Sequence, residues 1–379
     1  MTRPMRDFAL ETYMSKWEFS ARYNMTASDA ESMRLPDLLA MASDEDRSDF
    51  ETLHLGYTET FGAHALRHEI AKTYDTITPA DVLTFAGAEE AIYIAMRVLL
   101  TSADHAIIVT PNYQAAETIP LSICAATGVA LDIDDDWSLD LEQIEAAIRP
   151  NTKLISINFP NNPTGTILPR DTFDGLVSLC RKHGIWLFSD EVYRLIERDP
   201  ALRLPQAADV YERGISLNVM SKAYGLPGLR IGWLACKDRD VLERCERYKH
   251  FLSICNSGPS EVLARIALKN RERILDRNRA IVRANIACLN DFFAEFPRLF
   301  DWREPDGGCV AFIRYKGDDG VETFTRRLVE EAGLFFLPSS VYRSDLTPVP
   351  ENCLRIGFGR LHVPEGLDVM RNWLLRNSG

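Results

Sequence analysis

Residues 217–236 decide the fold, and they read LNVMSKAYGLPGLRIGWLAC. Two apolar runs, 217–220 and 231–236, are typical of buried strands. Lys222 comes just after the first run, and Arg230 lies eight residues later, beyond a glycine-rich turn. A lysine at the end of a buried strand can be desolvated, which lowers its pKa and lets the amine form a Schiff base. Taken alone, a lysine in this place is more often a solvated charge.

The flanking sequence alternates between strands and helices. Apolar runs predict strands at residues 105–110, 128–133, 153–158 and 185–189. Amphipathic segments predict helices at residues 91–100, 140–148 and 171–183. Several strands are apolar on both faces, which is typical of parallel strands covered by helices. The pattern therefore predicts an α/β fold with a mostly parallel sheet sandwiched by helices, and a ligand site beyond the carboxyl ends of its strands.

The pattern of predicted helices and strands changes near residue 260. A long, arginine-rich helical stretch begins there, and strands are predicted at 310–315 and 354–357. We expect a large domain at residues 46–260 and a smaller α/β C-terminal domain at 261–379. The N-terminal segment, 1–45, is expected to pack on the small domain or on a partner subunit.

Charge and composition exclude several classes of partner and binding site. The 379 residues include 43 basic and 55 acidic side chains, so the formal net charge is −12. This argues against a nucleic acid or an anionic membrane as the principal partner. The first ten residues lack the apolar core of a secretory signal, and the eight scattered cysteines show no zinc spacing. We expect reduced thiols, no metal site and a cytoplasmic location.

Two more motifs follow predicted strands. Residues 189–193 read SDEVY, which places Asp190 and Tyr193 at a strand end, and residues 159–165 read FPNNPTG, which includes Asn162. Read as structure alone, the first motif is an acidic turn with a core tyrosine and the second is a good turn.

Three further motifs suggest anion binding or stacking. Residues 87–89 open a helix, whose free N–H groups can bind a phosphate. Tyr113 stands at a strand end, where its ring could stack on a ligand or simply fill the core. Arg355 lies within the apolar run CLRIG, and its planar guanidinium suits a carboxylate, with a structural salt bridge as the alternative.

Together these motifs resemble the class I and II aminotransferases, a family of fold-type I enzymes that use pyridoxal phosphate (PLP). The resemblance runs from about residue 55 to residue 355, with the motifs in the family's order. It implies that Lys222 forms an aldimine with the cofactor and that Asp190 pairs with its pyridine nitrogen. Tyr193 and Asn162 would donate to the cofactor's O3′.

The resemblance also assigns the remaining cofactor and substrate contacts. Arg230 and the main chain of Gly87, Ala88 and Glu89 would bind the cofactor phosphate, and Tyr113 would stack on the pyridine ring. Arg355, together with Asn162, would bind the α-carboxylate of the substrate. Many relatives have a phosphate-binding hydroxyl three residues before the lysine, where this chain has Val219, so Ser221 is the neighbouring candidate.

The family pattern further implies a homodimer with shared active sites, because the counterpart of Tyr57 reaches the partner subunit's phosphate. The expected reaction moves an amino group from an L-amino acid to a 2-oxo acid. A lyase, cyclase or oxidase acting through the same quinonoid intermediate is the alternative, and a regulator that retains PLP without catalysis is a further one. The aromatic segment 17–23 would line the substrate pocket or form a helix on the other subunit, and Glu18 there would favour a cationic side chain.

Overall fold

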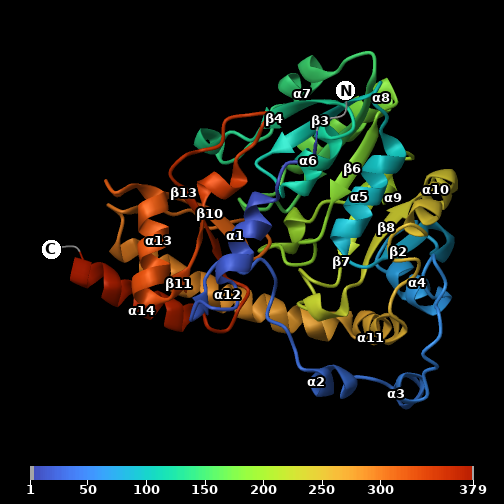
Figure 1. Cartoon of the computed structure of the whole chain (residues 1–379), viewed down its shortest axis with the longest axis horizontal. Helices are drawn as coiled ribbons and strands as arrows, with labels where there is room; N and C mark the ends of the chain where they lie inside the picture. Colours follow the sequence, from blue (N-terminus) through green and yellow to red (C-terminus); the bar gives the residue numbers. More distant parts are fainter. Residues whose placement is uncertain (1–3, 378–379) are drawn as a thin grey trace.

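The computed structural model describes residues 4–377. The strands of its largest sheet are β2 (Val82–Phe85), β3 (His105–Thr110), β4 (Ala125–Ala130), β5 (Thr152–Asn158), β6 (Trp186–Asp190), β7 (Gly214–Val219) and β8 (Gly232–Cys236). They lie in the order β2, β8, β7, β6, β5, β3, β4. β8 is antiparallel to β2 and β7, whereas the pairs from β7 to β4 are parallel. The predicted mostly parallel sheet is therefore confirmed (Figure 1).

Helices cover both faces of this sheet. Successive residues of β3 alternate between two apolar clusters, with Ala106 and Ile108 in one and Ile107 and Val109 in the other. The helices of this part of the chain are α4 (His64–Ala71), α5 (Ala88–Leu99), α6 (Ala115–Leu121), α7 (Leu141–Ala147), α8 (Arg170–His183), α9 (Ala207–Val210), α10 (Arg239–Lys249) and α11 (Gly258–Lys269). Apolar residues of α5 belong to the first cluster and those of α8 to the second, so each face has its own core.

A smaller antiparallel sheet follows in the C-terminal part. Its strands lie in the order β12 (Leu337–Pro338), β13 (Cys353–Gly357), β10 (Val310–Tyr315) and β9 (Phe300–Asp301). The helices of this part are α12 (Arg271–Glu295), α13 (Gly320–Ala332) and α14 (Val363–Asn377). In the register of β10 and β13, Phe312 lies opposite Arg355. The small sheet thus holds the predicted carboxylate-binding arginine in its second strand.

The first part of the N-terminal segment, α1 (Ala9–Trp17) and β1 (Tyr23–Asn24), is built into this smaller unit. The following helices, α2 (Leu35–Leu39) and α3 (Asp44–Glu51), instead contact α11. β1 pairs in parallel with β11 (Leu334–Phe335), and Leu10 and Met14 of α1 share an apolar cluster with Phe335. Figure 1 shows α1 between the C-terminal part and the large sheet. The domain boundaries stay a prediction, and residues 1–3 and 378–379 of the predicted outer segments lie outside the described residues.

Two local expectations need correction. The strand predicted at 128–133 is β4 (Ala125–Ala130), and Ile133 instead begins a 3₁₀ turn that the Asp132 side chain caps by accepting from the N–H of Asp134. Helix α1 ends at Trp17, so the aromatic segment 17–23 is a bend leading into β1 rather than a helix. The 3₁₀ turns are η1 (Pro79–Asp81), η2 (Ile133–Asp135), η3 (Pro200–Leu202), η4 (Pro227–Leu229) and η5 (Ser339–Tyr342). None of the helices between residues 4 and 377 is long and apolar enough to cross a membrane.

Candidate active site

A cavity of about 660 Å³ lies at the carboxyl ends of the parallel strands. Asn158, Asp190 and Val219, the last residues of β5, β6 and β7, all line it. Ten predicted site residues share this lining, namely Ala88, Glu89, Tyr113, Asn162, Asp190, Tyr193, Ser221, Lys222, Arg230 and Arg355. Motifs that are far apart in the sequence therefore meet in one cavity, at the edge of the sheet where the strand pattern predicts a ligand.

Lys222 sits just beyond β7, with its side chain in the cavity. Its Nζ donates a hydrogen bond to Oγ of Ser28 at 2.8 Å. Burial lowers the pKa of Lys222, the nearby charge of Asp29 opposes that shift, and Arg355 reinforces it. A lowered pKa increases the neutral fraction of the amine, which is the form that attacks a carbonyl carbon.

Asp190 is a half-buried carboxylate at the end of β6. Its Oδ1 accepts from the N–H of Val192 at 3.2 Å. Burial raises its pKa to about 6, while this hydrogen bond and the charge of Lys222 act in the opposite direction. A carboxylate in this state is stabilised by a cationic N–H donor, so the site fits a protonated pyridine nitrogen.

Tyr193 and Asn162 find partners within the chain. The phenol of Tyr193 donates to the backbone carbonyl of Ser28 at 2.8 Å, and Oδ1 of Asn162 accepts from Nη1 of Arg355 at 3.1 Å. Burial raises the pKa of Tyr193 well above its usual value, so the phenol stays protonated and can act as a donor. Both side chains line the same cavity as Lys222, as predicted for groups that contact one cofactor.

Arg355 is 1% exposed and carries an uncompensated charge. Its Nε donates to Oγ1 of Thr26 at 3.0 Å and its Nη2 to the carbonyl of the same residue at 2.7 Å. Across the described part of the chain, no carboxylate forms an ion pair with it, so the salt-bridge alternative gains no support. A buried guanidinium with neutral partners favours an anionic ligand, and a carboxylate fits its planar donors.

The predicted phosphate contacts converge at the start of α5. Gly87 precedes this helix with a φ of 99°, a conformation that side chains other than glycine rarely adopt. A Cβ at this position would collide with the guanidinium of Arg230. The free N–H groups of the first turn and a guanidinium therefore face one location, which fits a dianionic phosphate. Ser221 and Val219 also line the cavity.

Tyr113 and Tyr57 differ in their placement. Tyr113 lines the cavity, its ring lies 5.0 Å from that of Phe8, and its phenol donates to Oε1 of Glu11 at 2.9 Å. Tyr57 lies outside the cavity and is 90% exposed. A single chain therefore does not bring Tyr57 together with the other predicted residues.

Comparison with known proteins identifies the family. The sequence model for aminotransferase class I and II matches residues 24–368. The chain belongs to this family. It is 29% identical to the arginine–pyruvate transaminase of Pseudomonas aeruginosa over 76% of this chain and 74% of that protein. It is 25% identical to capreomycidine synthase of Streptomyces vinaceus over 94% of this chain and 88% of that protein.

Solved structures agree with this assignment. A PLP-dependent aminotransferase from Streptococcus suis superposes with a TM-score of 0.91 at 29% identity, and the match covers 99% of each chain. The predicted family, the α/β fold, the aminotransferase activity and the PLP cofactor are therefore confirmed. The roles of the individual site residues stay predictions.

Sequence motifs missed one wall of this aminotransferase's cavity. Residues 26–29 pass through the site, where Thr26 contacts Arg355, and Ser28 contacts both Lys222 and Tyr193. Asp29 also lines the cavity and forms an ion pair with Arg360 at 2.7 Å. The only signal in the sequence was a short polar run, TASD, after the aromatic segment. That segment does reach the cavity, because Glu18 and Phe19 line it.

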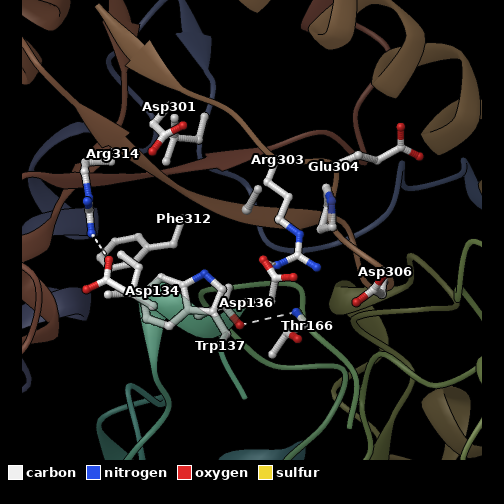
Figure 2. A pocket seen from close by; sticks show the side chains of 15 residues that line it. Asp134, Asp136, Trp137, Thr166, Asp301, Arg303, Glu304, Asp306, Phe312 and Arg314 are labelled. Carbon is white, nitrogen blue, oxygen red and sulfur yellow. Dashed lines mark hydrogen bonds and ion pairs between the residues drawn. The ribbon is translucent and has the colours of Figure 1, made fainter. Parts of the chain in front are cut away.

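A second cavity of the aminotransferase, about 270 Å³, lies between the turn after β4 and strand β10 (Figure 2). Arg314 forms an ion pair with Asp134 at 3.2 Å across it, and Arg303 forms another with Asp136. None of the predicted catalytic or cofactor-binding residues lines it. Its ion pairs are more than a third exposed, so we assign this cavity to the junction of two chain segments rather than to chemistry.

Proposed function

We propose that this aminotransferase uses Lys222 to hold PLP and Arg355 to hold the α-carboxylate of an L-amino acid, whose amino group passes to a 2-oxo acid. The convergence of Lys222, Asp190 and Arg355 on one cavity supports this assignment. Within residues 4–377, each of the three ionisable groups lacks a counter-charge in hydrogen-bonding contact, and each fits a different part of the cofactor or substrate.

The cofactor, when bound, supplies an electron sink that acidifies the Cα–H bond of the amino acid. Asp190 would keep the proton on the pyridine nitrogen. Tyr193 and Asn162 would donate to O3′. Arg230 and the first turn of α5 would bind the phosphate, which restrains the ring without taking part in proton transfer.

The amine of Lys222 would carry out the proton transfer. When it is not bound to the cofactor, Nζ would accept the Cα proton as general base and would then donate that proton as general acid to complete the amino transfer. Burial lowers the pKa of Lys222, which favours the neutral amine that the first of these steps needs. Arg355 would hold the α-carboxylate in two-point contact, and this fixes the direction of the Cα–H bond.

Reductive trapping tests the central assignment. Borohydride treatment of the holoenzyme should leave the cofactor on the peptide that contains Lys222, and Lys222→Ala should lose this adduct and lower turnover by about 10²–10⁴-fold. Lys237→Ala is the matched control, because Lys237 is exposed and lies outside the cavity lining. An adduct on another lysine would refute the assignment.

A lyase, cyclase or oxidase is the second candidate, because one relative over 94% of the chain is named a synthase rather than a transaminase. Product analysis separates the two. A transaminase converts an added 2-oxo acid into its amino acid in equal amount to the substrate consumed. A lyase or an oxidase would release ammonia, and a cyclase would give a cyclic amino acid.

We further propose a homodimer in which Tyr57 reaches the phosphate of the partner subunit. Leu55, near Tyr57, is 81% exposed, and Phe251, in the loop between α10 and α11, is 86% exposed. A hydrogen bond from Thr58 Oγ1 to the carbonyl of Asn256 at 2.9 Å joins these two segments. Apolar side chains exposed on adjoining segments favour a protein interface. Sedimentation of the holoenzyme tests for the dimer.

A cytoplasmic location is also proposed. Five of the eight cysteines are buried, and all eight are free thiols. Free, scattered cysteines are typical of a reducing compartment. Fractionation of cells that express the tagged chain tests this location.

A further inference from the structure

Helix α1 presents one face to the substrate cavity. Leu10, Glu11, Met14 and Glu18 all line the cavity. Their spacing of three, four and seven residues places them on one side of a helix. Leu10 and Met14 are buried, and the cavity is also lined by Glu11 of α1 and by Glu18, the residue that follows the helix. This wall of the cavity therefore combines two apolar side chains with two carboxylates.

The basic groups of the cavity already have assigned or observed partners. Lys222 and Arg230 are assigned to the cofactor and Arg355 to the substrate carboxylate. Arg360 forms an ion pair with Asp29 at 2.7 Å, so these two charges compensate each other. Among residues 4–377, no other lysine or arginine lines the cavity.

Three carboxylates remain without a cation. Glu11, Glu18 and Glu89 line the cavity, and none of them forms an ion pair with any residue in the described range 4–377. Glu11 accepts one neutral hydrogen bond, from the phenol of Tyr113 at 2.9 Å. Like charges that share a cavity repel one another, and a cation bound among them would relieve that repulsion.

The titration of these groups agrees with their geometry. Burial is the main cause that raises the pKa of Glu18, and the charges of Glu11 and Asp29 raise it further, while the charges of Arg360 and Lys222 act in the opposite direction. Burial raises the pKa of Glu89 to about 7, again with Glu11 as the next cause. Glu11 on α1 therefore lies within electrostatic range of carboxylates on two other parts of the wall.

We propose that the substrate of this site is an amino acid whose side chain ends in an ammonium or guanidinium group after an aliphatic stem. The inference rests on the proposed function, because it assumes that Arg355 holds the α-carboxylate. The aliphatic stem would pack on Leu10, Met14 and Ile92, which line the same cavity. The cationic end would lie among the carboxylates of Glu11, Glu18 and Glu89.

Pairs of amino acids that differ in charge but not in shape test this proposal. L-arginine is compared with L-citrulline, and L-lysine with L-2-aminoheptanoate, by the kcat/KM of amino transfer from the holoenzyme to one fixed 2-oxo acid. We expect the cationic member of at least one pair to be preferred by about tenfold or more, as for the loss of one hydrogen bond to a charged group. The better pair distinguishes guanidinium from ammonium recognition. Equal or reversed preference in both pairs overturns the proposal.

Charge-removing variants then test the named residues. Glu18→Gln and Glu11→Gln should each lower the cationic-to-neutral ratio of kcat/KM by about tenfold. Asp7→Asn is the matched control, since Asp7 belongs to the same N-terminal segment and lies outside the cavity lining. A purely structural role would lower both members of a pair together and leave their ratio unchanged, which refutes charge recognition by these two residues.

The failure of this inference can be distinguished from failure of the proposed function. Transfer from L-alanine or L-glutamate, without transfer from either cationic amino acid, would overturn only the inference. Absence of amino transfer from every amino acid, together with absence of borohydride-trapped cofactor on Lys222, would overturn the function on which it rests.

Discussion

Asp190 carries a charge that its surroundings disfavour. Burial raises its pKa to about 6, so in the protein without cofactor the carboxylate form is lost as the pH falls through that value. Because the pyridine nitrogen needs the carboxylate, we expect PLP to bind more weakly below about pH 6 than above it. The dissociation constant of the cofactor, measured by absorbance across this range, checks the expectation.

The cofactor phosphate also titrates near pH 6, so this measurement needs a control. Asp190→Asn preserves the size of the side chain and removes its titration. The variant should bind the cofactor more weakly above pH 6 and should retain only the part of the pH dependence that the phosphate causes. Identical pH profiles for the two proteins would refute the role assigned to Asp190.

Ser28, which no sequence motif indicated, contacts the reactive amine of Lys222. Its Oγ accepts from Lys222, while its backbone carbonyl accepts from Tyr193. Ser28→Ala removes only the first contact, so we expect kcat to fall by about two- to tenfold, as for one net hydrogen bond. Rapid-mixing kinetics would locate the loss in proton transfer, and Ser28→Thr, which keeps the hydroxyl, should restore most of the rate. An unchanged rate in Ser28→Ala would exclude a positioning role.

Buried, apolar strands are easier to predict from the sequence than edge strands. Strands β3 and β10 agree with their predicted bounds because their residues are almost all buried and apolar. Strand β4 lies at the edge of the sheet, and residues 125–128 are partly exposed and weakly apolar, so the hydrophobic signal begins only near Val129. An edge strand is specified by its pairing partner rather than by its own pattern.

Lys249, the last residue of α10, connects three elements of the large unit. It is fully buried, and its Nζ donates to the carbonyl of Thr60 at 2.8 Å, to that of Thr84 at 2.9 Å and to Oδ1 of Asn256 at 3.3 Å. Lys249→Met would leave these acceptors unsatisfied, so we expect the free energy of unfolding to fall by about 2–4 kcal/mol. Urea denaturation monitored by circular dichroism measures this change.

The same substitution would loosen the segment that carries Tyr57, because Thr60 lies three residues beyond it. Lys237→Met is the control, since that lysine is exposed and donates to a single carbonyl, that of Asp209. It should change the free energy of unfolding by less than about 0.5 kcal/mol. If both variants are equally stable, the internal hydrogen bonds of Lys249 contribute little.

At the scale of the whole molecule, the sequence predicts the motifs of the site but not how they contact one another. Ser28 meets Lys222 across 194 positions of sequence, and Thr26 meets Arg355 across 329. Local patterns carry no information about such contacts, because the folding of the N-terminal segment onto the smaller sheet creates them. The contact proposed for Tyr57 cannot be read from local patterns either, since the phosphate that it would reach is bound by a second copy of the chain.

Hybrid dimers test whether the active sites are shared. A protomer with Lys222→Ala retains Tyr57, and a protomer with Tyr57→Ala retains Lys222. If each site takes its tyrosine from the partner, a dimer of these two variants contains one site with both native residues and one site with neither. Mixing the two nearly inactive proteins after dissociation should therefore restore about one quarter of the parental activity, because half of the random dimers are hybrids with one native site each.

Unshared sites predict a different result for the same mixture. Every site of a hybrid would then carry one of the two defects, and activity would stay at the sum of the separate variants. The control uses Lys222→Ala with Asp190→Asn, whose side chains line the same cavity of one chain. This pair should not complement, because each defect stays within its own subunit, so recovery specific to the Tyr57 pair identifies that residue as the contribution of the partner subunit.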